Sequence, residues 1–383
     1  MFKKTSTYLV GYYGMRNSGD DALMYATAWG AKNLLDCDST IIGLYGDHNR
    51  HNPANHQLDL HFNQSFSGQN RLAHYKTAIK SKRIVFGGGA VLHSKSDINL
   101  KRHMMSLASP KKSLAVGVSI GPFQSIAAEK SCAHFLNECG YVGVRDNSSL
   151  EIANSIAPNA RVEKTFDLAP LLLCSNKYKA LKNERKGIAL SLCPVAIDPK
   201  GKTNKYAEKQ RKEELCQLIT TLYNNTNEKI TLLAFNGHHT LGDWSINNPI
   251  FARLKSTIPI EIKPYNPDPF AVLQDISNYK ALISMRLHGS VLGYLANTPV
   301  LSLNYHEKCR GWCEQIGLAD GYQLNLAEQS IHEILPPLEQ GLANGFLEPT
   351  LAVTQALQMA LSNWSINNEQ TKFHSRYSAL QQS

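Results

Sequence analysis

Arg286 and His288 are the two residues whose types and spacing point most directly to chemistry. They follow the apolar run Ala281–Ser284, which predicts a strand, and Gly289 closes the motif before a helical pattern that begins at Ser290. A strand that feeds a helix through a glycine turn leaves the first helical amides free to bind an anion. Arg286 adds a planar charged fork that suits a carboxylate or phosphate, and His288 adds a proton carrier. The motif therefore predicts an acidic, phosphorylated substrate and proton transfer.

Other candidate residues follow other predicted strands, where the ligands of α/β folds bind. They are Asn17, Asp20 and Asp21 after the first strand, Gly87, Gly88 and Gly89 after the strand 83–86, Arg145 and Asp146 after a later strand, and His238 and His239 in the loop 236–243. Each set also has a structural explanation. The glycines fit a turn, and the adjacent aspartates fit the first turn of a helix, where acids balance the dipole. Arg145 fits a local ion pair with Asp146, and the histidines fit polar loop positions.

The elements that must position these residues alternate between strand and helix along the whole chain. This alternation is typical of α/β domains with largely parallel sheets, and 383 residues suit two such domains. The lysine-rich stretch 175–186 predicts a linker between an N-terminal domain, 1–175, and a C-terminal domain, 186–345. Helices are expected over 326–339 and within 346–383, and the latter are expected to pack back on the N-terminal domain.

The composition excludes a wholly disordered chain. Apolar residues make up 43% of the sequence and charged residues 19%, which is ordinary for a globular protein. No apolar run approaches the roughly 20 residues that a membrane span requires. The apolar run 8–13 is too short for the core of a signal peptide. We therefore expect the protein in the cytoplasm, including the inner face of the membrane.

The net charge is +9, and much of the excess lies in 176–215, which holds eleven Lys or Arg and five Asp or Glu. Such a stretch can contact nucleic acid, an anionic membrane surface or an acidic substrate, or it can form a solvated linker and helix face. No helix-turn-helix, zinc-finger or RRM pattern supports nucleic acid. The eight cysteines are scattered, without a CxxC pair. Because HxxxH, DxD and cysteine-quartet spacings are also missing from the main motifs, we expect reduced thiols and no bound metal.

Several segments together resemble the polysaccharide pyruvyl transferase family. They are GYYGMRNSGDDAL, FGGG, SIGP, GVRD, FDLA, MRLHG with the following YLANTPV, and NYHEKCRGWCEQIGL. The first segment and MRLHG are specific, whereas the glycine turns are not, and the similarity extends from Gly11 to about Leu318. The resemblance implies two Rossmann-like domains facing a cleft, an architecture similar to GT-B. It also implies transfer of pyruvate from phosphoenolpyruvate to two hydroxyls of a sugar, in a polysaccharide or its lipid-linked precursor, as a ketal.

The resemblance also implies roles for individual residues. It places the donor on the C-terminal domain and the acceptor on the N-terminal domain, with phosphoenolpyruvate as co-substrate and no cofactor. The resemblance makes Arg286, Leu287 and His288 the donor-binding block, with His288 as the acid/base, and makes Arg145 and Lys308 further donor contacts. It places Asp20 and Asp21 near the acceptor, so that His288, Asp20 and Asp21 are the candidate catalytic residues. From their positions at the ends of predicted strands, we add Gly289 to the donor site and expect Asn17, Gly88, Gly89 and His239 at the acceptor site or cleft. The chemistry requires a proton on the methylene carbon of the donor and a base for the sugar hydroxyls. His288 suits the first task, while Asp20, Asp21 or a histidine of the loop 238–243 suits the second.

Two other classes of protein remain open. A nucleotide-sugar glycosyltransferase of cell-surface polysaccharide synthesis could share the same architecture, because a fold does not determine a function. A ribose-binding acid after a late strand would favour this alternative, but Asn304 and Tyr305 stand there, with Glu307 as a weak candidate. The other alternative is a binding protein without catalysis, against which the presence of Arg286 and His288 argues.

Overall fold

The computed structural model describes residues 6–35, 37–46, 52–175, 177, 184–195, 204–239 and 242–365 of the chain. These residues form two compact α/β units. The first unit contains the described residues of Met1–Met15, Asp20–Asn176 and Thr354–Ser383, and the second contains those of Arg16–Gly19 and Lys177–Val353. Four residues of the N-terminal motif, expected in the first domain, thus group with the second unit.

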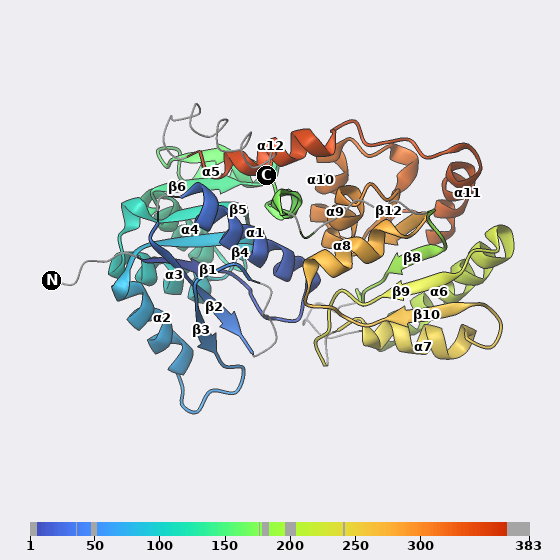
Figure 1. Ribbon diagram of the computed structural model, residues 1–383, viewed down its shortest axis with the longest axis horizontal. Helices are drawn as coiled ribbons and strands as arrows, with labels where there is room; N and C mark the ends of the chain where they lie inside the picture. The colour runs from blue at the N-terminus through green and yellow to red at the C-terminus, as the bar shows by residue number, and fades with distance from the viewer. Residues whose placement is uncertain are drawn as a thin grey trace. The chain divides into compact units, whose positions relative to one another are not determined.

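The first unit is built on a parallel sheet of seven strands in the order β3-β2-β1-β4-β5-β6-β7 (Figure 1). The strands are β1 Ser6–Val10, β2 Ser39–Tyr45, β3 His56–Leu60, β4 Ser81–Leu92, β5 Leu114–Ile120, β6 Tyr141–Val144 and β7 Val162–Lys164. Every residue of β5 is buried, as expected for a parallel strand covered on both faces. The strand order reverses between β1 and β4, which is where ligands bind in doubly wound sheets.

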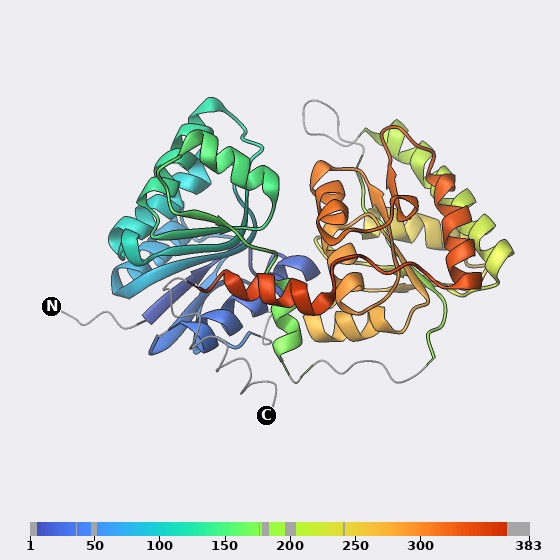
Figure 2. The ribbon, with the colours of Figure 1, turned by 90° about the horizontal axis from the view of Figure 1, so that it is seen from above.

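Helices cover both faces of this sheet (Figure 2). They are α1 Ser18–Leu34, α2 Gln69–Lys80, α3 Lys95–Leu107, α4 Ile126–Glu138, α5 Asn147–Ile156 and α12 Val353–Ser362, with short 3-10 helices at Pro110–Lys112 and Ala169–Cys174. Helices α2, α3, α4 and α5 pack side by side. The core beneath them includes the rings of Phe86 and Phe135, whose centroids lie 5.4 Å apart.

The residues just after α12 complete the first unit. The side chain of Asn363 is fully buried. Its Oδ1 accepts hydrogen bonds from the amide of Gly117 at 2.6 Å and from the hydroxyl of Thr165 at 2.7 Å, and its Nδ2 donates to the carbonyl of Phe166 at 3.0 Å. Polar groups within β5 and just after β7 therefore find their partner in the last described turn of the chain.

The second unit is a parallel sheet of six strands in the order β10-β9-β8-β11-β12-β13. The strands are β8 Ile188–Ser191, β9 Ile230–Leu233, β10 Ile260–Lys263, β11 Ala281–Ser284, β12 Val300–Asn304 and β13 Gln323–Asn325. The helices are α6 Lys205–Thr226, α7 Trp244–Leu254, α8 Pro269–Ser277, α9 Leu287–Leu295, α10 Glu307–Ile316 and α11 Leu335–Asn344, with 3-10 helices at Asp320–Tyr322 and Ile331–Ile334. The strand order reverses between β8 and β11, so the carboxyl ends of these two strands form the expected ligand edge.

The two units confirm the predicted α/β class, but several elements differ from the prediction. Gly87–Gly89 do not form a turn, because β4 continues through them with a shift of its register against β5 after Gly89. Gly88 and Gly89 have φ angles of 66° and 80°, and a side chain on Gly88 would lie 2.9 Å from Leu23 of α1. These glycines therefore bend the strand and let α1 approach it.

The helix after Arg286 begins earlier than predicted. It starts at Leu287 rather than Ser290, with Arg286 as its N-cap in an extended conformation. Gly289 is thus part of the first helical turn, where a β-carbon would overlap the hydroxyl of Ser284. The predicted helix over 326–339 is confirmed only from Leu335, where α11 begins, and a 3-10 helix at Ile331–Ile334 precedes it. Among the described residues, no helix is both long and apolar enough to cross a membrane.

Candidate functional site

Arg286 lies at the carboxyl end of β11 and binds a buried carboxylate. Its Nη2 donates to Oδ1 of Asp243, the residue that precedes α7. The other oxygen of Asp243 accepts hydrogen bonds from the backbone amides of Phe235 at 2.8 Å and Asn236 at 2.9 Å. Asp243 is completely buried, whereas the Arg286 side chain keeps 19% of its surface exposed. The arginine is therefore held by a buried carboxylate while part of its side chain stays exposed.

The electrostatics of this pair follow from its burial. Burial raises the pKa of the Asp243 carboxyl, and the charge and hydrogen bond of Arg286 oppose this shift. Burial by itself would lower the pKa of Arg286, but the charge of Asp243 raises it overall. Because three N–H donors converge on Asp243, its ionised form is the one that the geometry satisfies. Arg286 thus remains a cation, and the buried carboxylate of Asp243 is its counter-ion.

A thiol and a phenolic hydroxyl near Arg286 both stay neutral. Burial raises the pKa of the Cys193 thiol, and burial likewise raises the pKa of the Tyr305 hydroxyl. A second arginine, Arg211 of α6, donates from Nη2 to the sulfur of Met285 at 2.7 Å, directly before Arg286 in the chain. The charge that meets an incoming anion here is therefore set by arginine rather than by a thiolate or a phenolate.

His288 occupies the second position of α9 and packs against the backbone of Gly19. A β-carbon on Gly19 would lie 2.5 Å from Cγ of His288 and closer still to Nδ1. Gly19 is thus a position where a side chain would displace the imidazole. The start of α9 and the N-terminal motif, 269 residues apart in sequence, meet at this contact.

The segment Arg16–Gly19 is joined to the loop after β9. The amide of Ser18 donates to the carbonyl of Phe235 at 2.9 Å, and the amide of Gly237 donates to the carbonyl of Arg16 at 2.8 Å. Asn17 forms an antiparallel bridge with Asn236. The two backbone hydrogen bonds that make up this bridge explain why the segment belongs to the second unit.

Arg16 stands out within this segment. Its φ angle is 56°, a left-handed conformation that costs energy for a residue with a side chain. Its Nη1 donates to Nε2 of His239 at 2.9 Å. Asn17 and His239, two predicted acceptor or cleft residues, thus lie on adjoining segments of the second unit.

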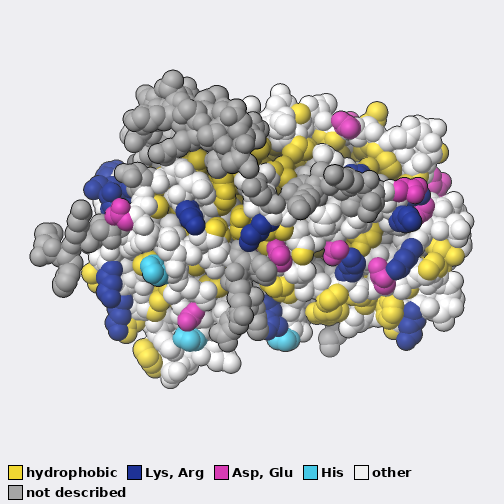
Figure 3. Space-filling model, viewed as in Figure 1, with side chains coloured by type: hydrophobic (Ala, Val, Ile, Leu, Met, Phe, Trp, Pro, Cys, Tyr) yellow, Lys and Arg dark blue, Asp and Glu magenta, His cyan; other side chains and the backbone are white. Residues whose placement is uncertain are grey.

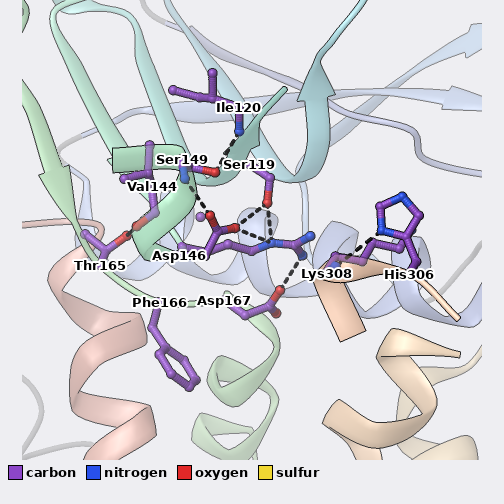
Figure 4. Close-up of polar contacts among 12 residues, drawn as sticks. Ser119, Ile120, Val144, Asp146, Ser149, Thr165, Phe166, Asp167, His306 and Lys308 are labelled. Carbon is purple, nitrogen blue, oxygen red and sulfur yellow. Dashed lines mark hydrogen bonds and ion pairs between the residues drawn. The ribbon is translucent and has the colours of Figure 1, made fainter. Parts of the chain in front are cut away.

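Arg145 belongs to a separate network in the first unit. Its guanidinium donates to Asp167 at 2.9 Å and to the hydroxyl of Ser119 at 2.7 Å, and it lies 3.8 Å from Asp146. Figure 4 shows Ser119, Asp146 and Asp167 pointing toward this shared position. Asp146 also caps α5 by accepting from the amide of Ser149 at 2.8 Å. The predicted ion pair with Asp146 is present, but Asp167, which was not predicted, is the nearer partner.

The remaining predicted residues lie at the starts of helices. Asp20 and Asp21 are in the first turn of α1, and Asp21 is fully buried. Leu287 is the first residue of α9. Lys308 is near the start of α10, where its amide donates to Nδ1 of His306 at 3.2 Å (Figure 4). Within the described ranges, no group of three or more His, Cys, Asp or Glu is arranged to hold a metal ion.

The structure thus brings together part of the predicted set and adds one residue to it. The predicted residues of the second unit are Asn17, His239, Arg286, Leu287, His288, Gly289 and Lys308, and those of the first unit are Asp20, Asp21, Gly88, Gly89 and Arg145. Sequence reasoning missed Asp243 as the partner of Arg286. The available signal was weak: Asp243 is the acid of the loop 236–243 and stands directly before a helix.

Comparison with known proteins identifies the family. The sequence model described as "Polysaccharide pyruvyl transferase" matches residues 17–307. Because the match covers most of the chain, the protein belongs to the polysaccharide pyruvyl transferase family. No curated protein matches the chain.

Solved structures resemble the fold at low sequence identity. UDP-GlcNAc 2-epimerase from Methanocaldococcus jannaschii aligns with a TM-score of 0.59 and 10% identity, over 92% of this chain and 98% of that one. UDP-GlcNAc 2-epimerase from Neisseria meningitidis gives 0.56 and 10%, over 94% and 100%. Anabaena Alr3699/HepE in complex with UDP and glucose gives 0.55 and 11%, over 97% and 99%. These likenesses show the fold alone, two Rossmann-like domains of the GT-B type.

Proposed function

We propose that the protein transfers pyruvate from phosphoenolpyruvate to two hydroxyls of a sugar, which become bridged by a ketal. The sugar would belong to a polysaccharide or to its lipid-linked precursor. Family membership supports a pyruvyl transferase. The observation that carries the donor assignment is Arg286 at the cap of α9, followed within the first helical turn by His288.

The donor suits this position because it carries a carboxylate and a phosphate. Arg286 offers a permanent charge with a planar fork of donors, and the first amides of α9 have no partner within the helix. The Arg286 side chain is partly exposed, so an anion can reach it. Arg145 and Lys308 are proposed as further donor contacts on the strength of the family resemblance.

The proposed reaction assigns His288 the proton. Transfer of a proton to the methylene carbon makes the adjacent carbon electrophilic, so that a sugar hydroxyl can attack it. Phosphate then leaves, and a second hydroxyl closes the ketal ring. Both hydroxyl protons need an acceptor, for which His239 and Asp20 are candidates. Asp21 is fully buried, so it does not meet a substrate hydroxyl directly. No oxidant, metal or organic cofactor is needed to balance these steps.

Contact with an anionic membrane surface is a separate proposal, supported by the net charge of +9. On the face that Figure 3 shows, the described Lys and Arg side chains are scattered and interspersed with Asp and Glu. A lipid-linked acceptor would bring the protein to such a surface. Sedimentation with vesicles of phosphatidylglycerol, compared with phosphatidylcholine vesicles, tests this point independently of catalysis.

A thermal-shift comparison tests the donor directly. Saturating phosphoenolpyruvate should raise the melting temperature by mass action, whereas UDP-GlcNAc and UDP-glucose should not. The same measurement on Arg286→Lys should show a smaller shift. A clear shift with a UDP-sugar and none with phosphoenolpyruvate would favour the nucleotide-sugar glycosyltransferase instead.

Turnover can be followed as phosphate release from phosphoenolpyruvate in the presence of p-nitrophenyl hexosides of different configuration. A productive acceptor should gain one pyruvate and lose two exchangeable hydroxyl protons, which mass spectrometry detects. A hexoside that gains a sugar from a nucleotide sugar under the same conditions would contradict the proposal.

A further inference from the structure

We propose that Asp243 is a positioning residue that orients the Arg286 guanidinium for the anionic donor; this inference rests on the proposed function. Asp243 does not itself reach the donor, because its side chain is completely buried. It acts through the contact between its Oδ1 and Nη2 of Arg286. The contact joins the loops that follow β9 and β11, the two strands on either side of β8.

Asp243 is suited to this role because its own position is fixed. Its Oδ2 accepts from the amides of Phe235 and Asn236, at 2.8 and 2.9 Å. The amide of Asp243 in turn donates to the carbonyl of Asn236 at 2.9 Å. The carboxylate thus has one oxygen bound to the backbone and the other directed at the arginine. A guanidinium attached to such a fixed point loses less freedom when a ligand arrives.

The contact uses one arm of the arginine fork and leaves the rest for a ligand. An arginine has five N–H donors in a rigid plane, so fixing Nη2 sets the direction of the others. Nε of Arg286 is buried and has no hydrogen-bond partner among the described residues, so the 19% of the side chain that is exposed is the part that a ligand can reach. Catalytic geometry tolerates little error, and a displacement of about 1 Å can lower the rate on the order of 100-fold. Asp243 is therefore expected to affect donor use without touching the donor.

A purely structural role for Asp243 is the rival explanation, since its backbone contacts also order the loop after β9. A double-mutant cycle separates the two. The variants are Asp243→Asn, Arg286→Lys and the double substitution, each measured by kcat/KM for phosphoenolpyruvate and by melting temperature. Asparagine keeps the size of the side chain but cannot offer acceptor oxygens to both the backbone amides and the arginine.

If Asp243 acts through Arg286, Asp243→Asn should lower kcat/KM roughly 10- to 100-fold at a temperature at which the variant is still fully folded, although loss of the buried ion pair also lowers its melting temperature. The double variant should lose no more activity than Arg286→Lys alone, because the two residues act as one unit. Should Asp243→Asn fail to fold, the cycle is run with Asp243→Glu, which keeps the carboxylate but moves it by one methylene. Glu261→Gln, on a partly exposed carboxylate bound to Lys229, is the matched control and should leave kcat/KM unchanged.

Near wild-type kcat/KM in Asp243→Asn, or losses that multiply in the double variant, would overturn the positioning role. Failure of the proposed function gives a different pattern. In that case the wild-type protein shows neither a thermal shift nor phosphate release with phosphoenolpyruvate, before any variant is compared.

Discussion

Gly19 and His288 are in such close contact that the glycine cannot carry a side chain without moving the imidazole. A β-carbon at Gly19 would lie 2.5 Å from Cγ of His288. The position of the predicted proton donor is therefore set from two directions, by the first turn of α9 and by the N-terminal segment Arg16–Gly19. This contact explains why position 19 is a glycine, which the sequence of the N-terminal motif alone does not explain.

Gly19→Ala should lower kcat by shifting His288, on the order of 10- to 100-fold, since small displacements of a catalytic group are costly. Gly311→Ala is the matched control, because a β-carbon on that helical glycine meets nothing within 4 Å. The control should keep full activity and gain a little stability. Equal kcat values for the two variants would show that the Gly19 contact does not position the imidazole.

His288→Ala should lose most of kcat, on the order of 10² to 10⁴ fold for a general acid. Its KM for phosphoenolpyruvate should change less, because Arg286 and the start of α9 remain. Phosphate release is the assay, and the exposed His134 provides a control substitution. A folded His288→Ala protein with near wild-type kcat would move the proton donor elsewhere, first to the loop that carries His239.

Arg286→Lys should weaken donor use although the charge is kept. Lysine lacks the fork that can hold Asp243 and an anion at the same time. Loss of a charge-assisted hydrogen bond costs about 1.5 to 3 kcal/mol, so KM should rise roughly 10- to 100-fold. The control is Arg310→Lys, on an exposed arginine of α10. Unchanged donor kinetics in Arg286→Lys would remove this residue from the site.

Arg145→Ala should destabilise the first unit by about 3 to 5 kcal/mol, because Asp167 is only 2% exposed and would lose its arginine. Adding Asp167→Asn to this variant removes the buried charge and should recover part of the loss. Arg161→Ala is the control, since its pair with Glu163 is about half exposed on both sides. Thermal melting compares them, and equal melting temperatures for Arg145→Ala and Arg161→Ala would contradict the prediction.

The stability of the protein should fall in mild acid because of His74. Burial, and then the charge of Lys101, lowers the pKa of His74 to about 4, and Nδ1 of His74 lies 2.7 Å from the hydroxyl of Tyr8. Unfolded histidine has a pKa of about 6.5. Between these values the unfolded chain binds the extra proton, so stability rises with pH and about 3 kcal/mol is lost as pH falls from 6.5 to 4.

His74→Gln should flatten this part of the pH profile, whereas His134→Gln at an exposed position should leave it unchanged. Melting temperatures measured at half-unit steps from pH 4 to pH 7 would show the difference. Parallel profiles for His74→Gln and the wild type would assign the acid sensitivity to other groups.

The sequence predicts elements well where the pattern is strong and local. Strand β6, Tyr141–Val144, has the sequence YVGV and is buried throughout, so a short apolar run is enough to indicate it. Strand β3 was missed because HQLDL is mostly polar and exposed, as befits an edge strand. Helix α3 was missed because its sequence, KSDINLKRHMMSL, is rich in polar residues.

The residues of the site were predictable one by one, but not their contacts. Arg286 and His288 follow a strand and precede a helix, which sequence patterns reveal. The contact between Arg286 and Asp243 depends on the strand order, in which β8 separates β9 from β11. The contact between His288 and Gly19 depends on the segment Arg16–Gly19, which groups with the second unit although the residues before and after it belong to the first. Neither arrangement has a periodic signal.

The position of Asn363 has a consequence for the order in which the protein is made. Its side chain satisfies Gly117, Thr165 and Phe166, yet it leaves the ribosome only after the whole of the second unit. At 5 to 20 residues per second, translation of that unit takes roughly 10 to 35 s. During this interval the amide of Gly117, the hydroxyl of Thr165 and the carbonyl of Phe166 lack the side chain of Asn363. The first unit therefore reaches its final packing only after the second unit has been synthesised, and the second unit can fold first.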